Sequence, residues 1–285
     1  MMQTRFPDSR LQAGAATNEA IESARFALAN DRPAEAERIA ANILKVNSGH
    51  REATKVLGYA LIMLYRSKEA VAVLEKAARG THDPEIETQL GIALRHNRRI
   101  DDAVVALKRA IKRKPPFPAA FHEFGQLLAS LQRFDEAIAV LKQGCDVAPM
   151  MADMAAQLGN IYYAVNDRKR AADCFRRALS LNPGHYAAAE ALGVALMNDH
   201  DYAEAAALFR NMVAEDPGNT NTRLSLGNCL LNLGEEDVAY ACLRAASARG
   251  QQFYGKALRI MVGAGRGRFW LRPSDATKLL KGGKA

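Results

Sequence analysis

The sequence predicts an all-α fold built from repeated antiparallel helix pairs. Glycine recurs at intervals of 33 or 34 residues, at Gly58, Gly91, Gly125, Gly159, Gly193 and Gly227. Alanine follows each of these glycines by twelve residues, at Ala70, Ala103, Ala137, Ala171, Ala205 and Ala239. A fixed period of this length is typical of proteins made of stacked helical repeats.

Each repeat unit is expected to contain two helices that pack closely. Apolar residues around the glycine recur at three- and four-residue intervals, as in Leu158, Ile161 and Tyr162, which is the spacing of one helix face. Glycine inside a helix costs about 0.8–1.0 kcal/mol relative to alanine, so its recurrence requires a packing reason. We therefore expect the glycine of the first helix and the alanine of the second helix to form a close crossing.

Proline is expected to end each second helix. Four prolines lie 24 residues after a repeat glycine, at Pro115, Pro149, Pro183 and Pro217. Pro84 lies 26 residues after the first glycine, Gly58. Proline lacks a backbone N–H and disfavours helix in the residue before it, so it stops one helix and resets the chain for the next pair.

These positions resemble the tetratricopeptide repeat. The pattern is clearest in the fifth unit, at Leu158, Gly159, Tyr162, Ala171, Phe175, Ala178 and Pro183. The tryptophan typical of the first helix of this repeat is absent, and Phe121 takes its place in one unit. The resemblance implies a right-handed α-solenoid of about seven helix pairs over residues 17–253. The expected units are 17–50, 51–83, 84–117, 118–151, 152–185, 186–219 and 220–253.

The N-terminal end departs from this period. The first unit keeps an alanine at Ala36 but has Ala24 where the other units have glycine. Residues 1–16 show no pattern, so we expect a flexible leader there.

The C-terminal end, residues 254–285, is expected to hold a capping helix and a basic aromatic tail. Apolar spacing over 251–263 predicts one more helix, which would cover the last repeat. The stretch PSDATKLL, residues 273–280, predicts a short basic tail helix. Between them lie Arg268, Phe269, Trp270 and Arg272. The aromatic pair is expected either to pack on the solenoid or to dock on a partner.

The charge of the chain is concentrated at this end. Hydrophobic residues make up 49% and charged residues 25% of the sequence, as in a folded protein. The formal net charge is +8, and the residues from Arg249 onward contain nine Lys or Arg and one acid, Asp275. No apolar run reaches the ~18 residues that span a bilayer, and the N-terminus has no secretory signal pattern, so a cytoplasmic location is expected.

The sequence contains no motif that indicates catalysis. The four cysteines show no CxxC spacing, and no histidine pair has the helical spacing of metal ligands. No phosphate-binding glycine loop and no nucleophile elbow is present. We therefore expect no enzymatic activity, no catalytic residue, no metal and no cofactor.

The resemblance implies that the first helices line a concave groove. Candidate groove residues stand three before, two before or one after the glycines: Lys55, Tyr59, His122, Gln126, Gln157, Asn160 and Asn228. Side-chain amides can donate to and accept from the backbone of an extended peptide. The alternative is that these are ordinary solvated polar residues.

Three functions follow from these patterns. The first is a scaffold or adaptor that holds a protein or peptide segment of unknown identity in the groove. The second is an anionic-surface or nucleic-acid binder that works through the basic tail, although nucleic acid is the less expected partner. The third is a regulatory module for a separately encoded glycan or sulfate transferase. It is suggested only because such repeats are often attached to enzymes of that kind.

Overall fold

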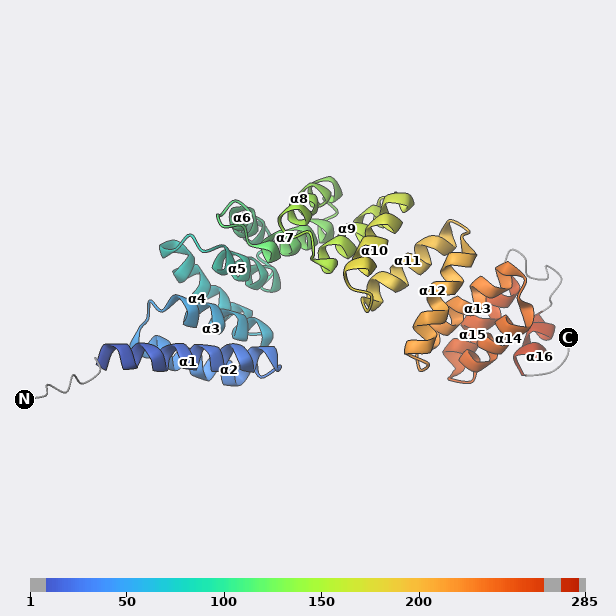
Figure 1. Ribbon diagram of the computed structural model, residues 1–285, viewed down its shortest axis with the longest axis horizontal. Helices are drawn as coiled ribbons and strands as arrows, with labels where there is room; N and C mark the ends of the chain where they lie inside the picture. Colours follow the sequence, from blue (N-terminus) through green and yellow to red (C-terminus); the bar gives the residue numbers. More distant parts are fainter. Residues whose placement is uncertain (1–8, 264–272, 282–285) are drawn as a thin grey trace, which may run out of the picture. The chain divides into compact units, whose positions relative to one another are not determined.

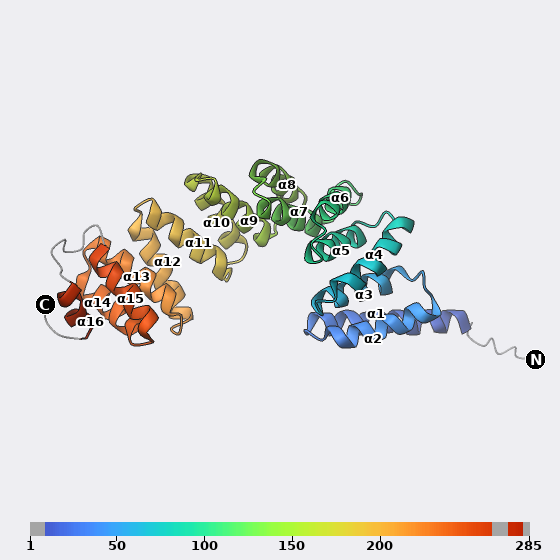
Figure 2. The same ribbon diagram turned by 180° about the vertical axis from the view of Figure 1, so that it is seen from behind.

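The computed structural model describes residues 9–263 and 273–281, and every regular element in those ranges is an α-helix. The helices form two compact units, residues 1–149 and 150–285. Figure 1 labels the helices in chain order and Figure 2 shows them from behind. The predicted all-α architecture of helix pairs is confirmed.

The described residues of the first unit form four helix pairs. In order they are α1 (Ser9–Ala29) with α2 (Pro33–Val46), α3 (Arg51–Met63) with α4 (Ser67–Gly80), α5 (Pro84–His96) with α6 (Ile100–Ala110), and α7 (Pro118–Ser130) with α8 (Phe134–Val147). Successive first helices also contact one another: α1 contacts α3, α3 contacts α5 and α5 contacts α7. One face of this unit is therefore made of first helices.

The described residues of the second unit form three pairs and two further helices. The pairs are α9 (Ala152–Ala164) with α10 (Arg168–Leu181), α11 (Tyr186–Asn198) with α12 (Tyr202–Glu215), and α13 (Thr220–Leu233) with α14 (Glu236–Ser247). Helix α15 (Gln251–Gly263) packs on α13 and α14, and α16 (Pro273–Leu280) packs on α14 and α15. The predicted capping helix and tail helix are both present.

Helix α1 is longer than the sequence pattern indicates. The pattern predicts a flexible leader over residues 1–16, but α1 already begins at Ser9. Residues Gly14 to Ala16 are exposed, so these three residues give no hydrophobic period. The segment is rich in alanine, and high helix propensity accounts for a helix without packing.

The six repeat glycines make room for a large apolar residue of the second helix. A Cβ atom added to Gly159 would lie 2.7 Å from Cε1 of Phe175, and one added to Gly91 would lie 2.5 Å from Cγ of Leu107. The same holds for the pairs Gly58–Leu74, Gly125–Leu141, Gly193–Phe209 and Gly227–Leu243. The large residue adds to the predicted crossing of glycine and alanine, and the alanine is also near at Gly227, where a Cβ would lie 3.5 Å from the backbone oxygen of Ala239. The six alanines are fully buried one helical turn before the large residue, on the same face of the second helix.

A left-handed residue stands in the turn of every pair, seven positions after the glycine. Its φ lies between 58° and 84° at Tyr65, Arg98, Gln132, Asn166, His200 and Gly234, and Asp31 repeats it in the first pair with a φ of 55°. Non-glycine residues seldom adopt this conformation. The closely packed helices therefore impose the turn geometry whatever residue stands there.

The prolines divide into three groups. Pro115 lies beyond the turn that follows α6, which already ends at Ala110, so it does not end that helix as predicted. Pro149, Pro183 and Pro217 lie just after the second helices α8, α10 and α12, as predicted. Pro84 instead begins α5, where its missing N–H is not needed.

Candidate functional site

A cavity of about 320 Å³ lies along the first helices of the first unit. We call it the α3–α5 cavity. It is lined by Arg25, Leu28, Lys55, Val56, Tyr59, Glu85, Thr88, Gln89, Ile92, Phe117, Ala119 and Glu123. The candidates Lys55 and Tyr59 therefore both reach it, and Tyr59 is 43% exposed.

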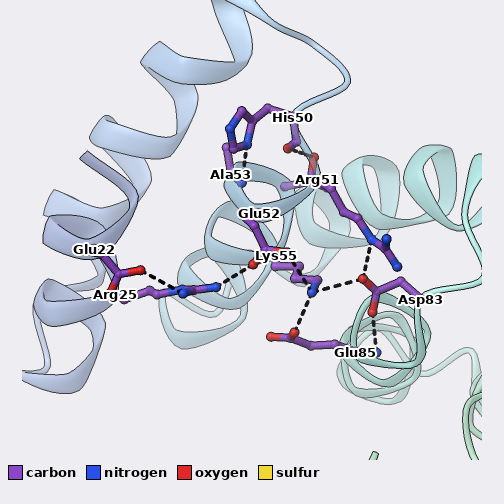
Figure 3. Close-up of polar contacts among 10 residues, drawn as sticks. Glu22, Arg25, His50, Arg51, Glu52, Ala53, Lys55, Asp83 and Glu85 are labelled. Atoms are coloured by element: carbon purple, nitrogen blue, oxygen red, sulfur yellow. Dashed lines mark hydrogen bonds and ion pairs between the residues drawn. The ribbon is translucent and has the colours of Figure 1, made fainter. Parts of the chain in front are cut away.

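Lys55 is occupied by carboxylates of the protein itself, as Figure 3 shows. Its Nζ lies 3.0 Å from Glu52 Oε1, 3.0 Å from Asp83 Oδ2 and 2.9 Å from Glu85 Oε2. Burial lowers the pKa of Lys55, but the hydrogen bonds to Glu85, Asp83 and Glu52 together raise it above its ordinary value. The ammonium group is therefore charged and neutralised internally, and it has little capacity for a ligand carboxylate.

Asp83 anchors this network at the start of α5. Its Oδ1 accepts from the Glu85 backbone N–H at 2.9 Å, and its Oδ2 accepts from Arg51 Nε at 2.6 Å. Burial raises the pKa of Asp83, but the hydrogen bond from Lys55, the Glu85 amide and the Arg51 contact lower it below its ordinary value. Asp83 thus caps one helix and ties it to the preceding first helix.

Gln89 presents a buried polar atom at the same cavity. The residue is only 6% exposed, and Oε1 has no hydrogen-bond partner among the described residues. The atom lies against Gly58, since a Cβ there would be 2.9 Å from it. Sequence reasoning missed Gln89, which stands two residues before Gly91, the same offset that placed Gln157 among the candidates.

The two candidates on α7 are held by neighbouring side chains. Gln126 Oε1 accepts a hydrogen bond from Arg95 Nη1 at 2.6 Å. His122 Nδ1 lies 3.8 Å from Glu123 Oε1, and Glu123 also pairs with Arg95 at 3.4 Å. These residues link α5 to α7, and neither His122 nor Gln126 lines the α3–α5 cavity.

A second cavity, of about 470 Å³, lies along first helices of the second unit. We call it the α13–α15 cavity. It is lined by Met197, Asn221, Leu224, Ser225, Asn228, Lys256, Arg259, Ile260 and Gly263. Asn228 therefore reaches a cavity, and its Oδ1 accepts from Asn232 Nδ2 at 3.1 Å. The candidates Gln157 and Asn160 lie on α9, and Asn160 is exposed; neither lines this cavity.

Lys256 and Arg259 are cavity residues that sequence reasoning did not identify. Both lie on α15, which the sequence predicts only as a cap. Continuing the period from Gly227 by 34 residues places Met261 in the glycine position, so α15 stands where the first helix of an eighth pair would stand. Continuing the period in this way would have placed Lys256 and Arg259 on a first helix.

The remaining predictions concern the basic tail, metal binding and membrane-spanning helices. Arg268, Phe269, Trp270 and Arg272 lie outside the described residues. Within residues 9–263 and 273–281, no three His, Cys, Asp or Glu side chains are grouped as metal ligands would be. None of the helices described there is both long and apolar enough to cross a membrane.

Family models for a helical repeat match most of the region in which the sequence shows its period. A family model described as tetratricopeptide repeat matches residues 21–84, 88–149 and 157–220, and a second model with that description matches residues 196–259. A search of curated proteins finds no match to this chain.

Several solved structures share the fold. PilF of Pseudomonas aeruginosa is 18% identical, covers 72% of this chain and 95% of its own, and has a TM-score of 0.61. A thermophilic tetratricopeptide repeat protein of Thermus thermophilus, TTC0263, is 20% identical, covers 64% of this chain and 99% of its own, and has a TM-score of 0.56. Human IFIT1, solved as a dimer with m7Gppp-AAAA, is 14% identical, covers 86% of this chain and 62% of its own, and has a TM-score of 0.60. At these identities the likeness concerns the fold alone.

Proposed function

The chain belongs to the tetratricopeptide repeat family, and from this premise we propose that it is a non-enzymatic scaffold that holds an extended segment of a partner protein on its first helices. Members of this family are generally non-catalytic and bind protein or peptide partners. The proposal concerns which surface of this chain does so.

One observation carries the proposal: two cavities, one in each unit, lie on first helices and use the same repeat positions. The residues three before and one after the glycine are Lys55 and Tyr59 at one cavity and Leu224 and Asn228 at the other. Thr88 and Ile92 stand at the same offsets around Gly91 and also line the α3–α5 cavity. A row of equivalent positions suits a ligand that is itself a chain with a repeating backbone.

The two cavities provide a mixture of apolar and polar groups. Leu28, Val56 and Ile92 can contact an apolar side chain, whereas Gln89 offers an amide in the same cavity. Pockets that recognise ligands usually combine an apolar lining with a few polar groups. This mixture supports a protein segment as ligand more than a polyanion.

Site-specific photo-cross-linking tests the surface directly. A photoreactive phenylalanine analogue placed at Tyr59 or Asn228 is expected to cross-link the partner in cells. The same analogue at Val147 or Val238, exposed residues of the second helices α8 and α14, provides the matched control. Cross-links that form equally from all four positions, or only from the second helices, would refute the proposal.

A further inference from the structure

The α13–α15 cavity carries positive charge that the described protein does not neutralise. Lys256 and Arg259 line it, and no carboxylate of the described residues does. Lys256 Nζ contacts the amide oxygen of Asn221 at 2.9 Å and lies 5.6 Å from the centroid of the Phe253 ring, and neither partner carries a formal negative charge. Arg259 is exposed and lines the same cavity. This differs from Lys55, which three carboxylates surround.

The surrounding first helices add little negative charge. Helices α13 and α15 contain no acidic residue, and α11 contains one, Glu190, which is exposed. Arg223 on α13 adds a further positive charge. A ligand with negative charge is therefore favoured at this face in both association rate and selectivity.

The cavity also offers neutral donors and an apolar wall. Asn228 uses its Oδ1 to accept from Asn232, and its Nδ2 donates to no described residue. Ser225 contributes a hydroxyl group, while Leu224 and Ile260 contribute aliphatic surface. Carboxylate oxygens accept from ammonium, guanidinium and amide N–H groups, and charged hydrogen bonds are stronger than neutral ones.

We propose that the α13–α15 cavity binds an acidic, extended polypeptide segment. One of its carboxylates lies between Lys256 and Arg259, and a neighbouring apolar side chain contacts Leu224 and Ile260. This inference rests on the proposed scaffold function, since it specifies the partner segment of that surface. A nucleic acid would meet the same two cations but would have no use for the apolar wall.

Fluorescence anisotropy with defined probes tests the charge class. The probes are a fluorescein-labelled peptide of alternating Glu and Ala with a central Leu, its Gln counterpart, and a labelled oligouridylate of similar length. The full chain should bind the Glu peptide more tightly than the Gln peptide, and the affinity should fall as salt rises from about 50 to about 200 mM because the charges are exposed.

Two charge-matched variants locate the binding. The double variant Lys256→Gln/Arg259→Gln should weaken binding of the Glu peptide about tenfold, which corresponds to about 1.4 kcal/mol. The control Lys142→Gln/Lys169→Gln removes the same charge from exposed positions of α8 and α10 and should leave the affinity unchanged. Circular dichroism checks that both variants keep their helices.

Three outcomes would overturn the inference. They are equal binding of the Glu and Gln peptides, an unchanged affinity in the cavity variant, or tighter binding of oligouridylate through Lys256 and Arg259. An unchanged affinity would place the interaction on other basic residues of the chain. The scaffold function would still stand if the cross-links from Tyr59 and Asn228 were formed, so the two proposals fail separately.

Discussion

Gly159→Ala is expected to destabilise the protein, whereas the same substitution in α15, Gly255→Ala, is expected to stabilise it. Both glycines lie inside helices of the second unit, so each gains about 0.8–1.0 kcal/mol of helix propensity when it becomes alanine. They differ in surroundings. A Cβ at Gly255 would meet nothing within 4 Å, but one at Gly159 would lie 2.7, 2.8 and 3.1 Å from three ring atoms of Phe175.

The loss of stability expected for Gly159→Ala depends on how freely the Phe175 ring can move. Phe175 is 1% exposed, so the ring can move only by displacing its neighbours. Overpacking of this kind costs about 1–3 kcal/mol, and three close contacts favour the upper part of the range. After subtraction of the propensity gain, we expect a net loss of about 1–2 kcal/mol.

Thermal unfolding followed by circular dichroism measures both changes. A change of about 1 kcal/mol moves the Tm of a chain of this size by about 2–4 °C, so Gly159→Ala should lower it and Gly255→Ala should raise it slightly. Because repeat proteins can unfold in parts, hydrogen exchange of α9 and α10 should report the loss locally.

A double-mutant cycle identifies the cause. In a Phe175→Ala background the ring is gone, so Gly159→Ala should become stabilising, as at Gly255. If Gly159→Ala raises the Tm in the otherwise unchanged protein, the close approach of helix and ring does not explain the repeated glycine.

Three further predictions concern single groups. Gly234→Ala places a Cβ at a φ of 84° and should cost about 1–2 kcal/mol, seen as a lower Tm; an unchanged Tm would show that the turn relaxes. The pKa of Asp83 is lower in the folded than in the unfolded chain, so its stabilising contribution is complete above about pH 4 and is lost as the pH falls below that value. Asp83→Asn should therefore flatten the dependence of Tm on pH in acid, and a curve parallel to that of the wild type would contradict the pairing. Burial raises the pKa of the Cys229 thiol to about 12, so this cysteine should resist a thiol reagent at a pH of about 8 until the protein unfolds; rapid labelling in the native state would contradict its burial.

Much of the helix arrangement could be predicted from the sequence because it depends on spacing along the chain. The glycine period implies helix pairs, and the apolar steps over 251–263 imply one more helix, which is α15. The sequence predicts a close crossing of small residues, but it does not identify the large residue that lies beside the glycine. Gly159 accommodates Phe175, one turn further along the second helix than Ala171.

The site was harder to predict because it depends on contacts between units of the repeat. Lys55 stands at a groove position, but its neutralisation requires Asp83, which belongs to the next unit and reaches it only through the packing of α5 on α3. The sequence did not identify Arg259 because Met261 and Pro273 stand where the period would place the next glycine and alanine. The left-handed turn residues leave no sequence signal, since Tyr65 and Gly234 occupy equivalent positions.

The ion network around Lys55 shows that added salt is expected to act unequally on the charges of this chain. In the first unit, Lys55 and Asp83 are largely shielded and join two helices, so salt should act there mainly by loosening more exposed pairs such as Arg25 with Glu52. In the second unit, exposed pairs such as Arg176 with Glu204 join helices and should be loosened in the same way. If the α13–α15 cavity binds an acidic segment as proposed, ionic strength would there change ligand occupancy as well as cohesion.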